Sequence, residues 1–144
     1  MLRYCIAAVV IATTTLLLAG CGESTQKFKA HAEPPVTMEL IDDDSGLTRL
    51  IFTQQAINRL GIETAAITEE AGKRVAPYSA LLYDSAGGTW VYINPQGLEF
   101  RRASVEVDRI RGDKAYLDEG PSVGSKVVTV GAAELFGAEY RVGG

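Results

Sequence analysis

The stretch from Gly120 to Gly124, GPSVG, fits the G-x-S-x-G pattern, in which a serine acts as the nucleophile on an acyl carbon. Such a serine needs a histidine held within hydrogen-bond reach as its base. The only histidine of the chain, His31, lies in a polar segment where no helix or strand is expected. The serine, Ser122, also precedes an expected strand rather than the helix that the pattern requires. We therefore interpret the stretch as a loop and expect that the protein is not an enzyme.

Metal and nucleotide chemistry also lack support in the sequence. The chain has two cysteines and one histidine, and it has no glycine-rich phosphate loop. The acidic run from Asp42 to Gly46 lacks the spaced oxygen ligands of a calcium loop, so we interpret it as a solvated turn. A formal net charge of −4 argues against binding to nucleic acid. We expect no catalytic residue, no metal ligand and no cofactor, apart from a covalent lipid.

The first 21 residues have the features of an export signal. Arg3 is followed by an apolar run that ends at Leu18, which is shorter than the roughly 20 apolar residues of a membrane span. The next residues complete the sequence Leu-Ala-Gly-Cys, which resembles the lipobox of bacterial lipoproteins. The resemblance implies a signal peptide over residues 1–20 and a diacylglyceryl group on the thiol of Cys21. The alternative is an ordinary secretory peptide with a chance cysteine.

A lipid on Cys21 implies a protein anchored at a membrane and exposed on the periplasmic side. Gly22 gives no acidic retention signal after the cysteine, so analogy with known lipoprotein sorting favours the outer membrane over the inner one. The following segment is polar, contains Pro34-Pro35 and shows no apolar periodicity. We therefore expect residues 21–44 to be the lipidated cysteine and a flexible tether.

Residues 45–142 are expected to form one domain of short strands separated by tight turns. A clear example is the turn Arg111-Gly112-Asp113, which separates two runs with alternating polar and apolar residues. We predict a mainly β fold, a small antiparallel β-barrel or roll with one or two short helices. One helix is expected between Thr53 as its N-cap and Gly61 after its end, and another after Val130. The expected strands cover residues 47–52, 62–68, 74–83, 89–93, 98–102, 104–110, 114–118 and 126–130.

The candidate contact residues lie on two of these strands. In strand 89–93 two aromatic side chains alternate with two aliphatic ones, so the two pairs face opposite ways. One pair lines the core, and the other is either covered by a loop or exposed as an aromatic contact patch. Two adjacent arginines nearby either meet an acidic partner or remain solvated strand charges. The candidate partner-contact residues are Trp90, Tyr92, Arg101 and Arg102.

Three stretches of the chain resemble one protein family. They are FTQQAINRLGIETAAI (residues 52–67), VAPYSALLYDSAGGTWVYINP (75–95) and GPSVGSKVVTVGAAELFGAEY (120–140). The first is similar to the opening segment, and the others to the C-terminal part, of the periplasmic adaptors or membrane fusion proteins of resistance-nodulation-division efflux pumps. In that family the two ends meet in the membrane-proximal domain, a small β-barrel or roll beside the inner-membrane transporter. The resemblance covers nearly all of residues 47–140.

The link Glu69–Lys73 stands where a full adaptor has its β-barrel, lipoyl and α-helical hairpin domains. The chain therefore resembles the membrane-proximal domain alone, without the parts that reach the outer-membrane channel. The resemblance implies a lipid-anchored interaction module that docks on an efflux transporter or adaptor. The alternative is a lipoprotein that uses the same domain to bind a small ligand or a metal.

Overall fold

The computed structural model describes residues 34–42 and 47–140. The expected signal peptide, the lipidation site Cys21 and His31 lie outside these residues. None of the described helices is long and apolar enough to cross a membrane.

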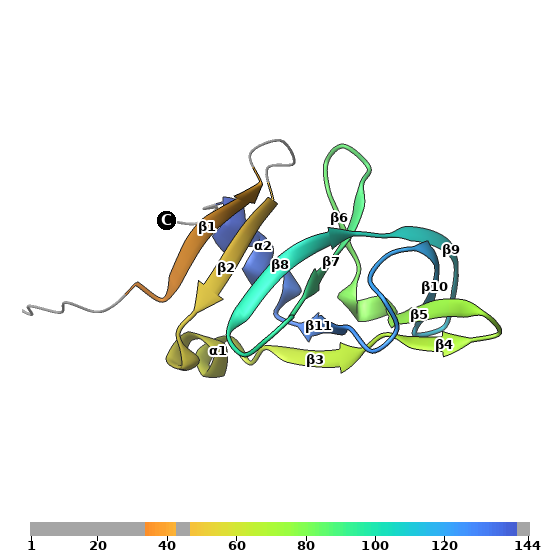
Figure 1. Ribbon diagram of the computed structural model, residues 1–144, viewed down its shortest axis with the longest axis horizontal. Coiled ribbons are helices and arrows are strands. Elements are labelled where there is room, and N and C mark those ends of the chain that lie inside the picture. The colour runs from red at the N-terminus through yellow and green to blue at the C-terminus, as the bar shows by residue number, and fades with distance from the viewer. Residues whose placement is uncertain (1–33, 43–46, 141–144) are drawn as a thin grey trace, which may run out of the picture. The chain divides into compact units, whose positions relative to one another are not determined.

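The described residues form two antiparallel sheets (Figure 1). The larger sheet has seven strands in the order β1-β2-β8-β7-β11-β3, with β6 paired to β7. The smaller sheet has four strands in the order β4-β5-β10-β9. The strands are β1 (Val36–Asp42), β2 (Leu47–Phe52), β3 (Glu63–Ala66), β4 (Thr68–Glu70), β5 (Lys73–Pro77), β6 (Leu82–Tyr83), β7 (Thr89–Ile93), β8 (Glu99–Ser104), β9 (Glu106–Arg111), β10 (Lys114–Glu119) and β11 (Lys126–Val130).

Two single residues carry the chain from one sheet into the other. Ile67 separates β3 from β4, and Val105 separates β8 from β9. Both side chains are buried in the same apolar cluster. Because each connection is one extended residue, the two sheets curl around a shared core, which confirms the predicted small antiparallel roll with short helices. Within the described residues the strands do not close into a barrel.

Several predicted boundaries are confirmed. The bounds of β2, β7 and β11 match the prediction, and β9 and β10 form the expected hairpin around Gly112. The predicted strand over residues 74–83 is wrong in its middle, where the 3-10 turn η1 (Tyr78–Ala80) interrupts it. Pro77 immediately precedes this turn, and proline has no N–H to continue a strand ladder.

The helix α1 (Gln54–Leu60) has the predicted caps. The Thr53 hydroxyl accepts a hydrogen bond from the backbone N–H of Ala56 at 3.2 Å. Gly61 closes the helix in the left-handed conformation, with φ 63° and ψ 37°. The second helix, α2 (Ala132–Tyr140), begins after Val130 as predicted.

The tether prediction is wrong for residues 36–42. This segment forms β1, which pairs antiparallel with β2 from Val36 opposite Phe52 to Asp42 opposite Leu47. Val36 and Met38 pack against the apolar cluster beneath α2, and this alternation outweighs the polar composition of the segment. The folded domain therefore begins before residue 45.

The link Glu69–Lys73 is a tight hairpin between β4 and β5. Its two turn residues, Ala71 and Gly72, have φ values of 51° and 77°. Two consecutive positive φ values are the requirement of the two-residue turns that suit the twist of a hairpin. The chain thus joins the two flanking strands directly.

The strand β7 lies between two apolar clusters. Val91 belongs to the cluster between the sheets, and Tyr92 belongs to the cluster under α2. Each side chain has a relative exposure of 0%. Both faces of this strand are therefore covered, because sheet and helix pack against it from opposite sides.

Candidate interaction surface

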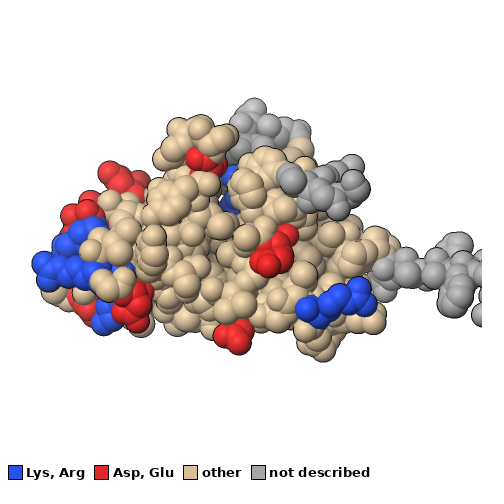
Figure 2. All heavy atoms as spheres, turned by 180° about the vertical axis from the view of Figure 1, so that it is seen from behind, with Lys and Arg blue, Asp and Glu red and all other residues tan. Residues whose placement is uncertain are grey.

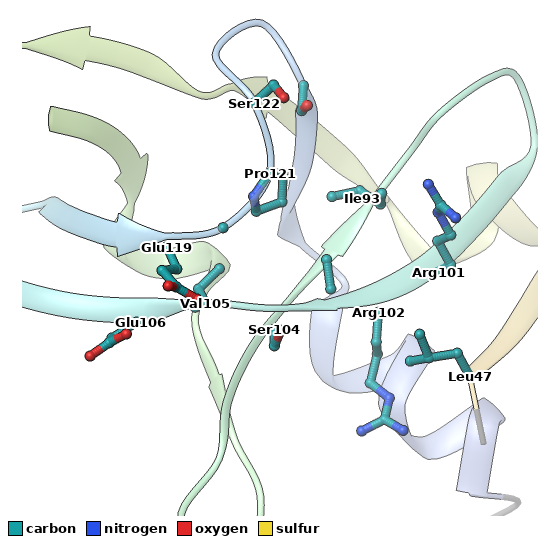
Figure 3. Close-up of a pocket in the computed structure, with 13 residues that line it drawn as sticks. Leu47, Ile93, Arg101, Arg102, Ser104, Val105, Glu106, Glu119, Pro121 and Ser122 are labelled. Atoms are coloured by element: carbon teal, nitrogen blue, oxygen red, sulfur yellow. The ribbon is translucent and has the colours of Figure 1, made fainter. Parts of the chain in front are cut away.

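Arg101 and Arg102 are neighbours on β8 and point to opposite faces of the larger sheet (Figure 3). Successive strand residues alternate between the two faces, so adjacent arginines enter different surroundings. Arg102 is 8% exposed, whereas Arg101 is exposed to solvent. The two faces are described in turn.

The face beneath α2 holds Arg102 in a network named here the Arg102 clamp. It consists of the buried side chains of Tyr92, Arg102 and Glu139, the half-buried Trp90 and the exposed Tyr140. The Arg102 Nε atom lies 2.9 Å from a carboxylate oxygen of Glu139, and the two side chains are 9% and 4% exposed. The Arg102 guanidinium also lies 4.7 Å from the centre of the Trp90 ring and 5.2 Å from that of Tyr140. The clamp therefore fastens the end of α2 to the sheet.

Tyr92 supplies a second donor to the clamp. Its hydroxyl donates a hydrogen bond to the Glu139 carboxylate. Burial, and then this hydrogen bond, raises the pKa of Tyr92 far above its ordinary value. The Tyr92 hydroxyl therefore stays protonated and acts as a structural donor.

Trp90 connects the clamp to the loop between β6 and β7. Its indole N–H donates to the Asp84 carboxylate at 2.7 Å, and the same carboxylate accepts the backbone N–H of Gly88 at 2.7 Å. The Trp90 hydrogen bond, followed by that of Gly88, lowers the pKa of Asp84. A Cβ on Gly88 would meet Asp84 and Trp90 at less than 3 Å, so a side chain at this position would displace the hydrogen-bonded pair.

Of the two alternatives for the aromatic pair, exposure as a contact patch is wrong for Tyr92, and the expected exposure of Arg102 is also wrong. Both side chains are buried and have internal partners. Trp90 is half-buried and its indole N–H is already used by Asp84. Of the four candidate contact residues, Arg101 alone is fully presented to solvent.

Arg101 lies on the opposite face, where three adjoining hollows share its side chain. The largest has a volume of about 640 Å³ and the next about 360 Å³. Together we name them the Arg101 groove. Figure 3 shows Arg101 and Ile93 on the side of the loop that carries Pro121 and Ser122. Arg102 also borders the largest hollow, but its side chain points to the other side of the strand.

The charges of the Arg101 groove lack internal partners. Within the described chain, neither Arg101 nor Lys126, which lines the same 360 Å³ hollow, forms an ion pair. Arg49 at the margin differs, because it lies 3.4 Å from Glu39 and 3.8 Å from Glu99. The groove thus presents cationic groups that are not neutralised from inside the domain.

The loop Gly120–Gly124 forms one wall of the groove and is confirmed as a loop. It leads into β11 and not into a helix. Ser122 is exposed, and the described residues include no histidine that could serve as its base. The arrangement therefore gives no support to a nucleophilic role for Ser122.

The smaller sheet carries a different charge pattern. Figure 2 shows lysine, arginine and acidic side chains crowded together at its end of the domain. Lys114 pairs with Glu70 at 2.5 Å, and the Glu70 carboxylate also accepts the Tyr116 hydroxyl at 2.9 Å. The Lys114 hydrogen bond, and then that of Tyr116, lowers the pKa of Glu70. Lys114 and Glu70 therefore neutralise each other at the surface.

No cluster of three or more metal-binding side chains occurs in residues 34–42 and 47–140. A comparison of the chain with models of known protein families, with curated proteins and with solved structures finds no match.

Two residues of these sites escaped prediction from the sequence. Glu139 follows the buried Leu135 by four residues on α2, so helical spacing alone places an acid on the buried face. Because a buried acid needs a cationic partner, this spacing could have predicted a buried arginine or lysine on another element. Lys126 gave no comparable signal, because a lysine at the start of a strand is ordinary.

Proposed function

We propose that the protein is a lipid-anchored interaction module that docks through the Arg101 groove on a transporter or adaptor component at the membrane surface. Two features of the sequence support this proposal. The lipobox-like end of the signal segment supports anchoring through Cys21, and the resemblance to periplasmic adaptors supports an efflux component as the partner.

The observation that carries the proposal is the contrast between Arg101 and Arg102. Arg102 is paired with Glu139 inside the domain, whereas Arg101 stands in a groove without an ion-pair partner among the described residues. An exposed charge that no internal partner neutralises and that borders a groove is suited to an external contact. Its position on a strand gives it a fixed direction.

The test is capture of partners from detergent-solubilised native membranes with the lipidated protein as bait. Cys21→Ala supplies the soluble control, and Arg101→Gln removes the charge from the groove. Arg59→Gln is the matched control, because Arg59 is also an exposed arginine but lies on α1, away from the groove. We expect a transporter or adaptor component with the parent protein and Arg59→Gln, and a reduced yield with Arg101→Gln. Abundant bait that brings no such component would overturn the proposal.

A second candidate function rests on the size of the largest hollow. About 640 Å³ falls within the range of small-molecule sites. A lipoprotein that binds a soluble ligand there would be stabilised by that ligand, as linkage requires. A rise in the unfolding temperature with a soluble compound, lost in Arg101→Gln, would favour this alternative over docking.

A further inference from the structure

We propose that the occupant of the Arg101 groove is an extended segment of the partner protein with an acidic residue at one end and a basic residue about five positions away. The acid contacts Arg101, and the base contacts Glu106 and Glu119. This inference rests on the proposed docking function and adds the chemistry of the partner. It follows from the distribution of charge along the groove.

One end of the groove is cationic. The hollow beside the loop that follows β7 is lined by Arg101, Lys126 and uncharged residues, with no acid in its lining. The formal charge of the whole chain is −4, so this end is a local exception to the acidic character of the protein. A carboxylate is the protein group that meets an arginine with two parallel hydrogen bonds.

The other end of the groove is anionic. Glu106 and Glu119 are directly paired across β9 and β10, and both line the largest hollow. Like charges at directly opposed positions destabilise a sheet, and neither glutamate has an ion-pair partner within the described residues. Figure 3 shows both glutamates well apart from Arg101. A basic side chain placed there would relieve the repulsion.

The floor of the largest hollow is partly apolar. Its lining includes the apolar residues Ile93, Ala103, Val105 and Pro121 together with Ser104, Ser122 and Ser125. From Arg101 to Glu106 the chain advances five residues, which corresponds to at most about 17 Å of extended strand. An extended segment of the partner spans the same distance with a similar number of residues. Its apolar side chains would face this floor.

A polypeptide fits these features better than a compact small molecule. The three hollows share Arg101 in their linings, and the largest of them, which is open to solvent, reaches from Arg101 to Glu106 and Glu119. Compact ligands bind in sites that enclose most of their surface. Opposite charges at the two ends also fix the direction in which a segment lies, because the reverse direction places like charges together.

A direct test uses a labelled probe peptide, Glu-Thr-Val-Thr-Val-Thr-Lys with blocked termini, in which both charges and both valines share one face of an extended chain. It is added to the full chain in detergent, with fluorescence polarisation as the readout. We expect binding that weakens roughly fivefold or more in Arg101→Glu, since one lost charge pair at about 1 kcal/mol corresponds to that factor. A probe that begins with Lys should restore binding to Arg101→Glu and should bind the parent protein poorly. The control Arg59→Glu should bind the first probe as the parent does. Equal binding of both probes to the parent protein would overturn the inference.

Zero-length carbodiimide cross-linking tests the same contact in the captured complex. The variant Arg101→Lys places an amine in the groove that couples to a touching carboxylate, and Arg59→Lys is its control. We expect an amide between position 101 and an aspartate or glutamate of the partner, with a basic residue about five positions away. A cross-link from position 101 to the chain's own residues 42–44 would show that this chain fills its own groove and would overturn the inference.

The two proposals fail separately. If capture succeeds but Arg101→Glu retains the partner, the groove chemistry is wrong and docking stands. If no membrane component is captured but the probe binds with the expected charge dependence, docking on a transporter or adaptor is wrong and the groove chemistry stands.

Discussion

The two faces of β8 give two adjacent arginines different roles. Arg102 is buried, paired with Glu139 and held between two aromatic rings, whereas Arg101 is exposed in a groove without a partner in the described chain. Arg101 and Arg102 have the same side chain and are adjacent on the same strand. The difference lies in what the fold brings to each face: a helix covers one, and a loop borders the other.

The comparison teaches that burial determines what an ion pair contributes to a structure. A buried charge left without its partner is costly, because the low-dielectric interior does not replace the lost solvation. An exposed charge keeps most of its solvation and is free to exchange water for a partner protein. Changes to the Arg102 clamp should therefore appear in stability, and changes to the Arg101 groove should appear in binding.

The largest effect is expected for Glu139→Ala. The substitution leaves Arg102 buried without its counterion and removes the acceptor of Tyr92, so the free energy of unfolding should fall by about 3–5 kcal/mol. Urea unfolding of the parent and the variant at neutral pH measures this loss in the free energy of unfolding. Glu134→Ala is the control, because Glu134 is an exposed acid on the same helix. A similar small loss for both variants would show that the clamp does not stabilise the fold.

A smaller effect is expected for Tyr92→Phe. Removal of a hydrogen bond to a charged group should lower the free energy of unfolding by about 1.5–3 kcal/mol at neutral pH. The folded-state pKa of Tyr92 is raised, so its contribution is complete below the unfolded pKa of about 10 and declines as the pH rises above that value. The gap between parent and variant should thus narrow above pH 10 in urea unfolding. A gap that widens there would contradict the assigned role.

Trp90→Phe should have a weaker effect than Tyr92→Phe. It keeps an aromatic ring beside Arg102 and removes only the hydrogen bond to Asp84. That bond is the largest cause of the lowered pKa of Asp84, so the pKa should rise toward its ordinary value in the variant. An NMR titration of the Asp84 carboxyl measures this change. An unchanged pKa would mean that the backbone N–H groups of the loop alone hold the carboxylate.

The smallest effect is expected at the surface of the smaller sheet, for Glu70→Gln. The lowered pKa of Glu70 means that its contribution is present above the unfolded pKa of about 4.3 and is lost as the pH falls through the folded value. The variant should therefore be slightly less stable than the parent at neutral pH and should lose less stability on acidification, so that the two converge at low pH. Urea unfolding at pH 7 and pH 3 checks this, and a large loss at pH 7 would contradict it.

Local signals in the sequence predicted much of the fold. Thr53 and Gly61 marked the ends of α1 because capping is a property of a few adjacent residues, and Gly112 marked a hairpin for the same reason. The segment 36–42 was misassigned, because its pairing with β2 is a tertiary contact that its polar composition concealed. Pro77 was a local signal for the interruption of the predicted strand over residues 74–83, and the prediction did not use it.

The candidate site was harder to predict. Strand alternation requires Arg101 and Arg102 to face opposite ways, but it does not tell which face a helix will cover. That outcome depends on Glu139, which lies 37 positions after Arg102. The like-charge pair of Glu106 and Glu119 likewise depends on the register of β9 and β10, which bulges shift in this hairpin.

The division of roles between the two arginines is tested most directly by urea unfolding of Arg101→Gln and Arg102→Gln side by side. We predict that Arg101→Gln stays within about 0.5 kcal/mol of the parent, as expected for an exposed site, and that Arg102→Gln loses about 3–5 kcal/mol, as expected for a broken buried pair. Equal losses in the two variants, or a larger loss for Arg101→Gln, would contradict the assignment of one arginine to folding and the other to binding.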